Sequence, residues 1–152
     1  MFWIPDETEC WIPATCVDEN IVKETIRVSL PGGRVVEIKR SNCIPISDPD
    51  RLDDAPDDLI TLSEVNEASI LNGMRKRFVD KNIYTACGSV LMVVNPFAKI
   101  DNLYGDEQIN YYRDPYAEGL IPHIYIISSR AFTFMINSNK NQSILISGES
   151  GW

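Results

Sequence analysis

The chain has 152 residues, enough for one domain or for a small domain and part of a second. Its net charge of −8 argues against a surface that binds nucleic acid or an anionic membrane. No apolar run approaches the roughly 20 residues of a membrane span, and residues 1–7 lack the pattern of a secretory signal. The four cysteines have no C-x-x-C pair and no histidine at zinc spacing, which indicates reduced thiols in a cytoplasmic protein and no metal site.

The first part of the chain has the pattern of short strands. Apolar Ile26, Val28 and Leu30 alternate with polar residues, Pro31-Gly32-Gly33 provides a turn, and the alternation resumes over residues 36–39. This pattern predicts a β-hairpin, and several short strands within residues 1–46 suggest a small barrel. Trp-Ile-Pro occurs at residues 3–5 and 11–13. We interpret the tryptophans as core or barrel-closing residues rather than as a peptide-binding surface.

Residues 47–58 form an acidic segment, with six aspartates and one arginine. Proline and aspartate with little apolar content indicate a linker, and we expect a solvated connector rather than an acidic interaction tail. Thr61 and Glu64 then have the spacing of a helix capping box, with Ile60 and Val65 as a hydrophobic staple. The predicted helix ends at a basic triplet and buries one apolar face, made of Val65, Ala68, Leu71, Met74 and Phe78.

A second hairpin is predicted from two strand-like runs, residues 83–87 and 90–94, separated by Gly88-Ser89. The second run is apolar throughout, so we expect it to be covered on both faces. It ends at Asn95-Pro96-Phe97, a turn that leaves the sheet at a position favourable for a ligand.

Two helices are predicted next, over residues 106–113 with Asp106 as the cap and over residues 123–135. The second helix is expected to bury Ile124, Ile127, Ala131, Phe134 and Met135. His123 has no ligand partner at metal spacing, so we interpret it as a helix-start residue rather than a catalyst.

The chain closes with a predicted strand and a glycine-rich turn. Residues 143–146 read as a buried strand, and Gly148-Glu149-Ser150-Gly151 begins like a phosphate-binding loop. The full motif is G-x-x-x-x-G-K-[ST], in which lysine reaches the phosphates and the hydroxyl holds Mg²⁺. Trp152 follows Gly151, so the second glycine, the lysine and the Ser/Thr are absent from these residues.

Several stretches resemble the myosin motor head. N-Q-S-I-L-I-S-G-E-S-G at residues 141–151 is similar to the family run N-Q-S-[IL]-L-[IV]-[ST]-G-E-S-G-A-G-K-T. I-Y-T-A-C-G-S-V-L-M-V-V-N-P-F at residues 83–97 is similar to I-Y-T-Y-x-G-x-x-L-[VI]-x-[VI]-N-P-[FY]. W-I-P-D and W-I-P-A resemble the opening of the SH3-like barrel that precedes many myosin heads. The resemblance implies a small SH3-like β-barrel at 1–46, an acidic linker at 47–58, and an incomplete α/β P-loop motor-domain fragment at 59–152.

The resemblance also implies nucleotide-binding residues. Asn95 and Pro96 match the family loop that flanks the purine of ATP, and Tyr104 matches its closing tyrosine. Gly148, Glu149, Ser150 and Gly151 match the front half of the P-loop. Ala98 stands where the family has lysine, and the stretch to Tyr104 is one residue longer than usual, so Lys99 receives no role.

The function implied is that of a piece of an actin-based, ATP-driven motor, cytoplasmic and associated with the cytoskeleton. Phosphoryl transfer depends on the P-loop lysine and on Mg²⁺, and the family's switch loops and actin-binding region lie further along its chain. We therefore assign no catalytic residue and expect this piece alone to bind ATP and Mg²⁺ poorly and to be inactive as an ATPase.

Two alternatives stay open. A non-enzymatic protein-interaction module, made of the barrel and the acidic linker, predicts that residues 1–58 fold alone. The second alternative is a different P-loop enzyme, although the match to the purine loop argues against it. In each case we expect exposed strand edges and apolar surface, because the sheet partners of residues 90–94 and 144–146 are expected outside these 152 residues.

Overall fold

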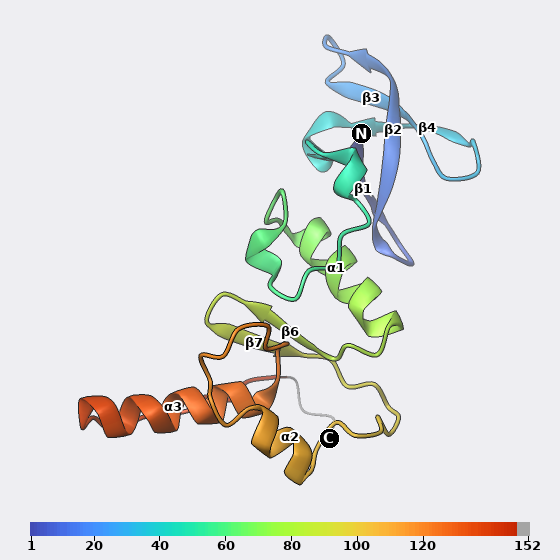
Figure 1. Cartoon of the computed structure of the whole chain (residues 1–152). Coiled ribbons are helices and arrows are strands. Elements are labelled where there is room, and N and C mark those ends of the chain that lie inside the picture. The colour runs from blue at the N-terminus through green and yellow to red at the C-terminus, as the bar shows by residue number, and fades with distance from the viewer. Residues whose placement is uncertain (149–152) are drawn as a thin grey trace. The chain divides into compact units, whose positions relative to one another are not determined.

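A computed structural model describes residues 1–148 (Figure 1). The chain divides into two compact units, Met1–Arg77 and Phe78–Trp152. Each unit has its own sheet and is described by itself.

The first unit contains a five-stranded antiparallel sheet with the strand order β4-β3-β2-β1-β5. The strands are β1 (Phe2–Asp6), β2 (Cys10–Asn20), β3 (Thr25–Ser29), β4 (Val35–Lys39) and β5 (Ile44–Pro45). The predicted hairpin is confirmed: Ile26 lies opposite Ile38, and Val28 lies opposite Val36. Gly32 and Gly33 both have positive φ in its turn, a conformation that glycine adopts without steric cost.

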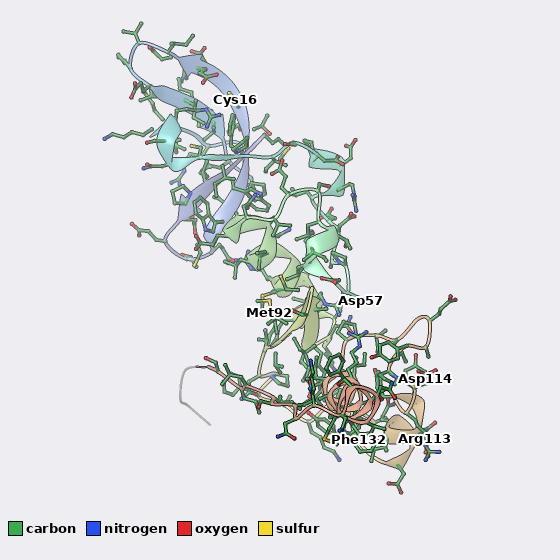
Figure 2. All side chains as sticks on the ribbon, turned by 90° about the vertical axis from the view of Figure 1, so that its left-hand side faces the viewer. Cys16, Asp57, Met92, Arg113, Asp114 and Phe132 are labelled. Carbon is green, nitrogen blue, oxygen red and sulfur yellow. The ribbon has the colours of Figure 1, made fainter. Side chains whose placement is uncertain are left out.

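The core of this sheet consists of residues whose side chains alternate inward. Ile4, Ala14, Ile26, Val28 and Cys43 are buried together, and burial raises the pKa of the Cys43 thiol. Trp3 is also buried, which confirms its interpretation as a core residue, and Trp11 is half-buried. Strand β2 has a bulge between Cys16, labelled in Figure 2, and Asp18.

A 3₁₀ helix, η1 (Arg40–Asn42), connects β4 to β5. Two more, η2 (Pro49–Arg51) and η3 (Leu59–Thr61), lie between β5 and helix α1 (Glu67–Val79). The predicted capping box at Thr61 is wrong. Thr61 lies in η3, and the Glu64 carboxylate accepts a hydrogen bond from Ser47 N instead. The reciprocal pair is Asn66 and Ser69, in which each side-chain oxygen accepts the backbone N–H of the other residue. Because Glu64 is bound to Ser47, the next good capping residue starts the helix.

The acidic segment is attached to α1 and differs from the solvated connector expected. The Leu52 carbonyl accepts hydrogen bonds from Asn72 Nδ2 and Lys76 Nζ, and Lys76 also pairs with Asp53. Arg77 pairs with Asp57 at 2.8 Å and donates to the Ala55 carbonyl. The basic end of α1 therefore holds the segment in place.

The buried face of α1 also differs from the one predicted. Ala68, Gly73 and Arg77 are its buried residues, whereas Phe78 is exposed. A Cβ at Gly73 would lie 3.1 Å from Leu59 Cδ2, so a glycine lets the fully buried Leu59 side chain approach the helix closely.

The second unit contains a two-stranded sheet, β6 (Tyr84–Cys87) and β7 (Val90–Val93), with helices α2 (Asp106–Tyr111) and α3 (Ile124–Ser138). The predicted hairpin is confirmed, with Cys87 opposite Val90 across the Gly88-Ser89 turn. Helix α2 ends earlier than predicted, and its N-cap is Gly105 rather than Asp106. No helix in residues 1–148 combines the length and apolar character that crossing a membrane requires.

Three expectations for apolar residues of this unit are wrong. Val90 on β7 is 60% exposed, because β6 is the only strand within residues 1–148 that pairs with β7. Residues 143–146 form no strand, and Leu145 is 92% exposed; a strand needs a neighbour for its backbone groups, and no described residue pairs with this run. On α3, Ile126 is buried, whereas Ile124, Phe134 and Met135 of the predicted face are exposed, as is Phe132, labelled in Figure 2.

Candidate functional site

The loop of residues 95–104 leaves the sheet directly after β7. Its entry is fixed locally: Asn95 Oδ1 accepts a hydrogen bond from Phe97 N at 2.8 Å, and Phe97 has a φ of 48°. An asparagine that binds the backbone two residues ahead forms a turn by itself. Asn95 therefore acts in this structure as the residue that turns the loop away from the strand.

The loop lines a half-open hollow of about 480 Å³. Its lining comes from one residue before β6 and from most of the loop: Ile83, Pro96, Ala98, Lys99, Ile100, Asp101, Asn102, Leu103 and Tyr104. Sites for small molecules commonly have about this volume. Of the three predicted purine-loop residues, Pro96 and Tyr104 line the hollow, and Asn95 supports the turn beside it.

The hydroxyl of Tyr104 is hydrogen-bonded, while more than half of the residue is exposed to solvent. Its hydroxyl lies 2.6 Å from the hydroxyl of Tyr84 on β6, while 56% of the residue is exposed. Tyr84 is only 5% exposed; burial, followed by the hydrogen bond to Tyr104, raises its pKa well above the ordinary value. The Tyr84 hydroxyl therefore keeps its proton at neutral pH and can keep its hydrogen bond to Tyr104.

His123 lies buried at the start of α3 and uses both ring nitrogens. Nδ1 accepts a hydrogen bond from Tyr125 N and so caps α3, which confirms the predicted helix-start role. A ring nitrogen that accepts carries no proton, so Nε2 carries it and donates to the Leu103 carbonyl at 3.0 Å. Burial lowers the pKa of His123, which favours this neutral form.

Aromatic rings surround the histidine. The Tyr112 ring stacks on it at 4.7 Å with an interplanar angle of 10°, and the rings of Tyr84 and Tyr125 lie at 4.8 Å and 4.6 Å. Sequence reasoning identified Tyr104 but missed Tyr84, Tyr112 and Leu103 as its support. The hydrogen bonds Tyr84–Tyr104 and Leu103–His123 each join residues 20 apart in the chain, and a local pattern carries no signal for such contacts.

Of the predicted P-loop residues, only Gly148 lies among the described residues; Glu149, Ser150 and Gly151 lie outside them. A Cβ placed on Gly148 would meet no atom within 4 Å, so no described atom approaches the backbone closely there. No group of three His, Cys, Asp or Glu side chains within residues 1–148 has an arrangement that could hold a metal ion. The lining of the hollow is mixed, with apolar side chains such as Ile83 and Pro96 and polar ones such as Asn102.

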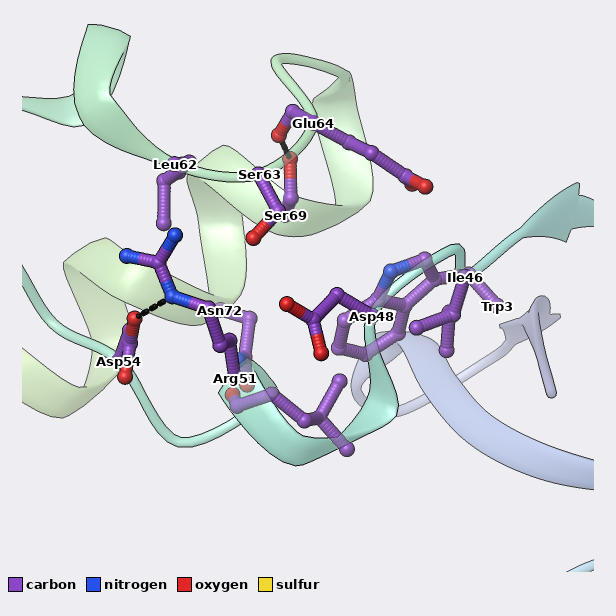
Figure 3. A pocket seen from close by; sticks show the side chains of 11 residues that line it. Trp3, Ile46, Asp48, Arg51, Asp54, Leu62, Ser63, Glu64, Ser69 and Asn72 are labelled. Atoms are coloured by element: carbon purple, nitrogen blue, oxygen red, sulfur yellow. Dashed lines mark hydrogen bonds and ion pairs between the residues drawn. The ribbon is translucent and has the colours of Figure 1, made fainter.

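A second hollow lies in the first unit and is much smaller, about 40 Å³ (Figure 3). Trp3, Asp48 and Leu62 contribute to it, with the Arg51–Asp54 ion pair and the hydrogen bond from Ser69 Oγ to the Glu64 carbonyl at its border. It has room for a few water molecules and none for an organic ligand.

Comparison with known proteins identifies the family. The family profile described as myosin head (motor domain) matches residues 56–152. The chain is 32% identical to myosin-4 of Saccharomyces cerevisiae and 36% identical to both myosin-13 of Arabidopsis thaliana and myosin-52 of Schizosaccharomyces pombe. Each alignment covers 98% of this chain and 10% or 11% of the relative.

The chain therefore belongs to the myosin head (motor domain) family, which confirms the resemblance found in the sequence. It spans about a tenth of the length of these relatives.

Proposed function

We propose that this chain supplies the purine side of the ATP site in a myosin motor head. Pro96 and Tyr104 contact the adenine, and Asn95 fixes the turn that presents them. The observation that carries the proposal is the hollow of about 480 Å³ lined by Pro96 and Tyr104, in the part of the chain that matches the family. A proline ring and a half-exposed tyrosine provide flat apolar contact, which suits a purine.

The phosphate side of the same site is proposed from the sequence. Gly148, Glu149, Ser150 and Gly151 form the front half of the P-loop, and in the whole protein the lysine and hydroxyl of the full motif complete it around ATP and Mg²⁺. These 152 residues contain neither of those two groups in that motif. The chain by itself is accordingly a weak binder of Mg-ATP and does not hydrolyse it.

The domain division follows the same proposal. Residues 1–46 form an SH3-like barrel, residues 47–58 an acidic linker and residues 59–152 the start of the motor domain. Support comes from the five-stranded antiparallel sheet of the first unit and from the family profile, which begins at residue 56. In the whole protein, ATP hydrolysis is coupled to movement on actin filaments, in the cytoplasm and at the cytoskeleton.

The alternative function, a non-enzymatic interaction module of barrel and linker, has less support. It requires the linker carboxylates to be available to a partner. Asp53 and Asp57 are exposed but already paired with Lys76 and Arg77 of α1, so a partner would have to compete with these ion pairs.

Photoaffinity labelling of the 152-residue chain tests the purine assignment. An ATP analogue with an azide on its adenine should modify residues 95–104, and excess ATP or ADP should suppress the modification. Peptide mass spectrometry locates the modified residues. Removing the Tyr104 ring in Tyr104→Ala should reduce the labelling of this loop by about fivefold or more, because stacking on an aromatic ring contributes about 1 kcal/mol or more.

Tyr116→Ala is the matched control, since Tyr116 is exposed and does not line the hollow. Labelling that spreads over the chain, or that ATP does not suppress, would refute the assignment.

A further inference from the structure

Two buried side chains from different elements converge on the end of the 95–104 loop. Tyr84 of β6 meets Tyr104 hydroxyl to hydroxyl, and His123 at the start of α3 binds the carbonyl of Leu103. We propose that Tyr84 and His123 are positioning residues that fix the last two residues of the loop and thereby orient the Tyr104 ring. The role of that ring toward adenine rests on the function proposed above; the fixing of the loop does not.

Among residues 1–148, few contacts hold the middle of the loop. Phe97 and Asn102 adopt positive φ, which is costly for residues other than glycine. The Lys99–Asp101 ion pair has a distance of 3.9 Å and is almost fully exposed, so it contributes little. Order in this loop therefore depends on its two ends: the Asn95 turn at its start and the contacts of Leu103 and Tyr104 at its close.

The two partners of the tyrosine contact differ in burial and in their place in the fold. Tyr84 sits in the β6–β7 ladder opposite Val93 and is buried, whereas Tyr104 is more than half exposed. The hydroxyl of a strand residue therefore holds the distal end of the Tyr104 ring in place and limits how far the side chain can swing. Breaking the contact forfeits the hydrogen bond between the two hydroxyls, which contributes about 1 kcal/mol.

The position of the His123 ring is also fixed by its neighbours. Its ring is stacked on Tyr112 and bound through Nδ1 to the first turn of α3, so Nε2 points in one direction only. Nε2 faces the carbonyl of Leu103, one residue before Tyr104, and donates a hydrogen bond to it. The backbone and the side chain at the end of the loop are thus held by two residues, His123 and Tyr84, whose rings also contact each other.

Amide hydrogen exchange of the 152-residue chain without nucleotide tests the positioning role. In Tyr84→Phe, which keeps the ring and removes the hydroxyl, exchange in residues 99–104 should rise about fivefold, the effect of losing one hydrogen bond. Tyr104→Phe removes the same hydrogen bond from the other side, so the double variant should exchange no faster than either single variant. Tyr111→Phe is the matched control, because the Tyr111 hydroxyl donates to Gly119 on the surface and not to the loop.

His123→Asn separates positioning from helix capping. Asparagine is a good N-cap, so it can replace Nδ1 toward Tyr125 N, but it is too short to reach Leu103. Exchange should rise about fivefold in residues 99–104 and remain unchanged in α3. If His123→Asn raises exchange throughout the second unit, the Tyr84→Phe and Tyr104→Phe variants test the positioning role instead.

The proposal is overturned if exchange in residues 99–104 is unchanged in both tyrosine variants, or if their effects add in the double variant. Labelling with the azido-adenine analogue of ATP separates this proposal from the function. Faster exchange together with labelling reduced about fivefold in Tyr84→Phe supports both. Faster exchange in a chain whose loop is not labelled at all supports the positioning role and rejects the purine assignment.

Discussion

At the scale of single residues, buried groups with defined partners carry most of the specific information in this chain. His123 is neutral because it is buried and because one nitrogen accepts while the other donates. Arg77 is charged and buried, with Asp57 and the Ala55 carbonyl as partners. His123 therefore stabilises the fold in its neutral form, and Arg77 does so through its pair with Asp57.

The burial of His123 predicts a pH dependence of stability. Its pKa in the folded chain lies below the ordinary value of 6.5, so the unfolded chain binds the proton more readily. Stability from this group is present above pH 6.5 and decreases as the pH falls from there through the lowered pKa. Thermal unfolding at pH 7.5, 6.5 and 5.5 should show a declining midpoint, and His123→Asn should flatten the decline. An equally steep decline in that variant would assign the effect to other groups.

Substituting Arg77 should lower the free energy of unfolding more than substituting the nearby Arg75. Arg77→Met should lower the free energy of unfolding by about 2 kcal/mol, because the Ala55 carbonyl loses its donor and a half-exposed Asp57 loses its partner. Arg75→Met should cost about 0.5 kcal/mol, because the Arg75–Glu9 pair is exposed to solvent. Urea denaturation monitored by circular dichroism measures both. Equal costs for the two substitutions would contradict the buried role of Arg77.

At the scale of elements, α1 shows how a helix start is chosen between two competing signals. Thr61-x-x-Glu64 and Asn66-x-x-Ser69 both have suitable spacing, and the second is the one used. Glu64 is not free to cap because it accepts from the backbone of Ser47. The choice therefore depends on a contact 17 residues away in the chain.

The cap assignment gives a direct prediction. Asn66→Ala should lower the free energy of unfolding by about 1 kcal/mol, the usual effect of removing an N-cap. Thr61→Val, which keeps the shape of the side chain and removes only the hydrogen bond to the Asp58 carbonyl, should have a smaller effect. Chemical denaturation compares the two variants. A larger loss for Thr61→Val would restore Thr61 as the helix cap.

At the scale of the whole molecule, the second unit presents much apolar surface. Phe132, Phe134 and Ile136 on α3 are exposed, as are Val90 and Val93 on β7 and the run 144–146. Exposed large apolar side chains in this number are typical of chains that bind another chain segment or that aggregate. This is the exposed surface expected from the sequence.

The exposed apolar residues predict self-association of the 152-residue chain. Light scattering at increasing concentration should show particles larger than a monomer, and Phe132→Ser with Leu145→Ser should reduce their amount without lowering the melting temperature. The matched control is Ile26→Ser, which places a hydroxyl in the core and should lower the melting temperature markedly. A wild-type chain that stays monomeric would contradict the prediction.

The sequence by itself determined both hairpins, the helices α1, α2 and α3 to within a few residues, the helix-start role of His123 and the family. These features depend on local periodicity, on turn residues such as Gly32 and Gly88, and on long motifs, all of which are written in consecutive residues.

Only the tertiary structure decided which cap starts α1, that the acidic segment binds the basic end of that helix, and that Tyr84 and His123 hold the end of the 95–104 loop. It also decided that residues 143–146 form no strand among the described residues. The physical reason is the same in each case. A hydrogen bond or a buried face needs a partner, and these partners come from distant parts of the chain, where periodicity carries no information about them.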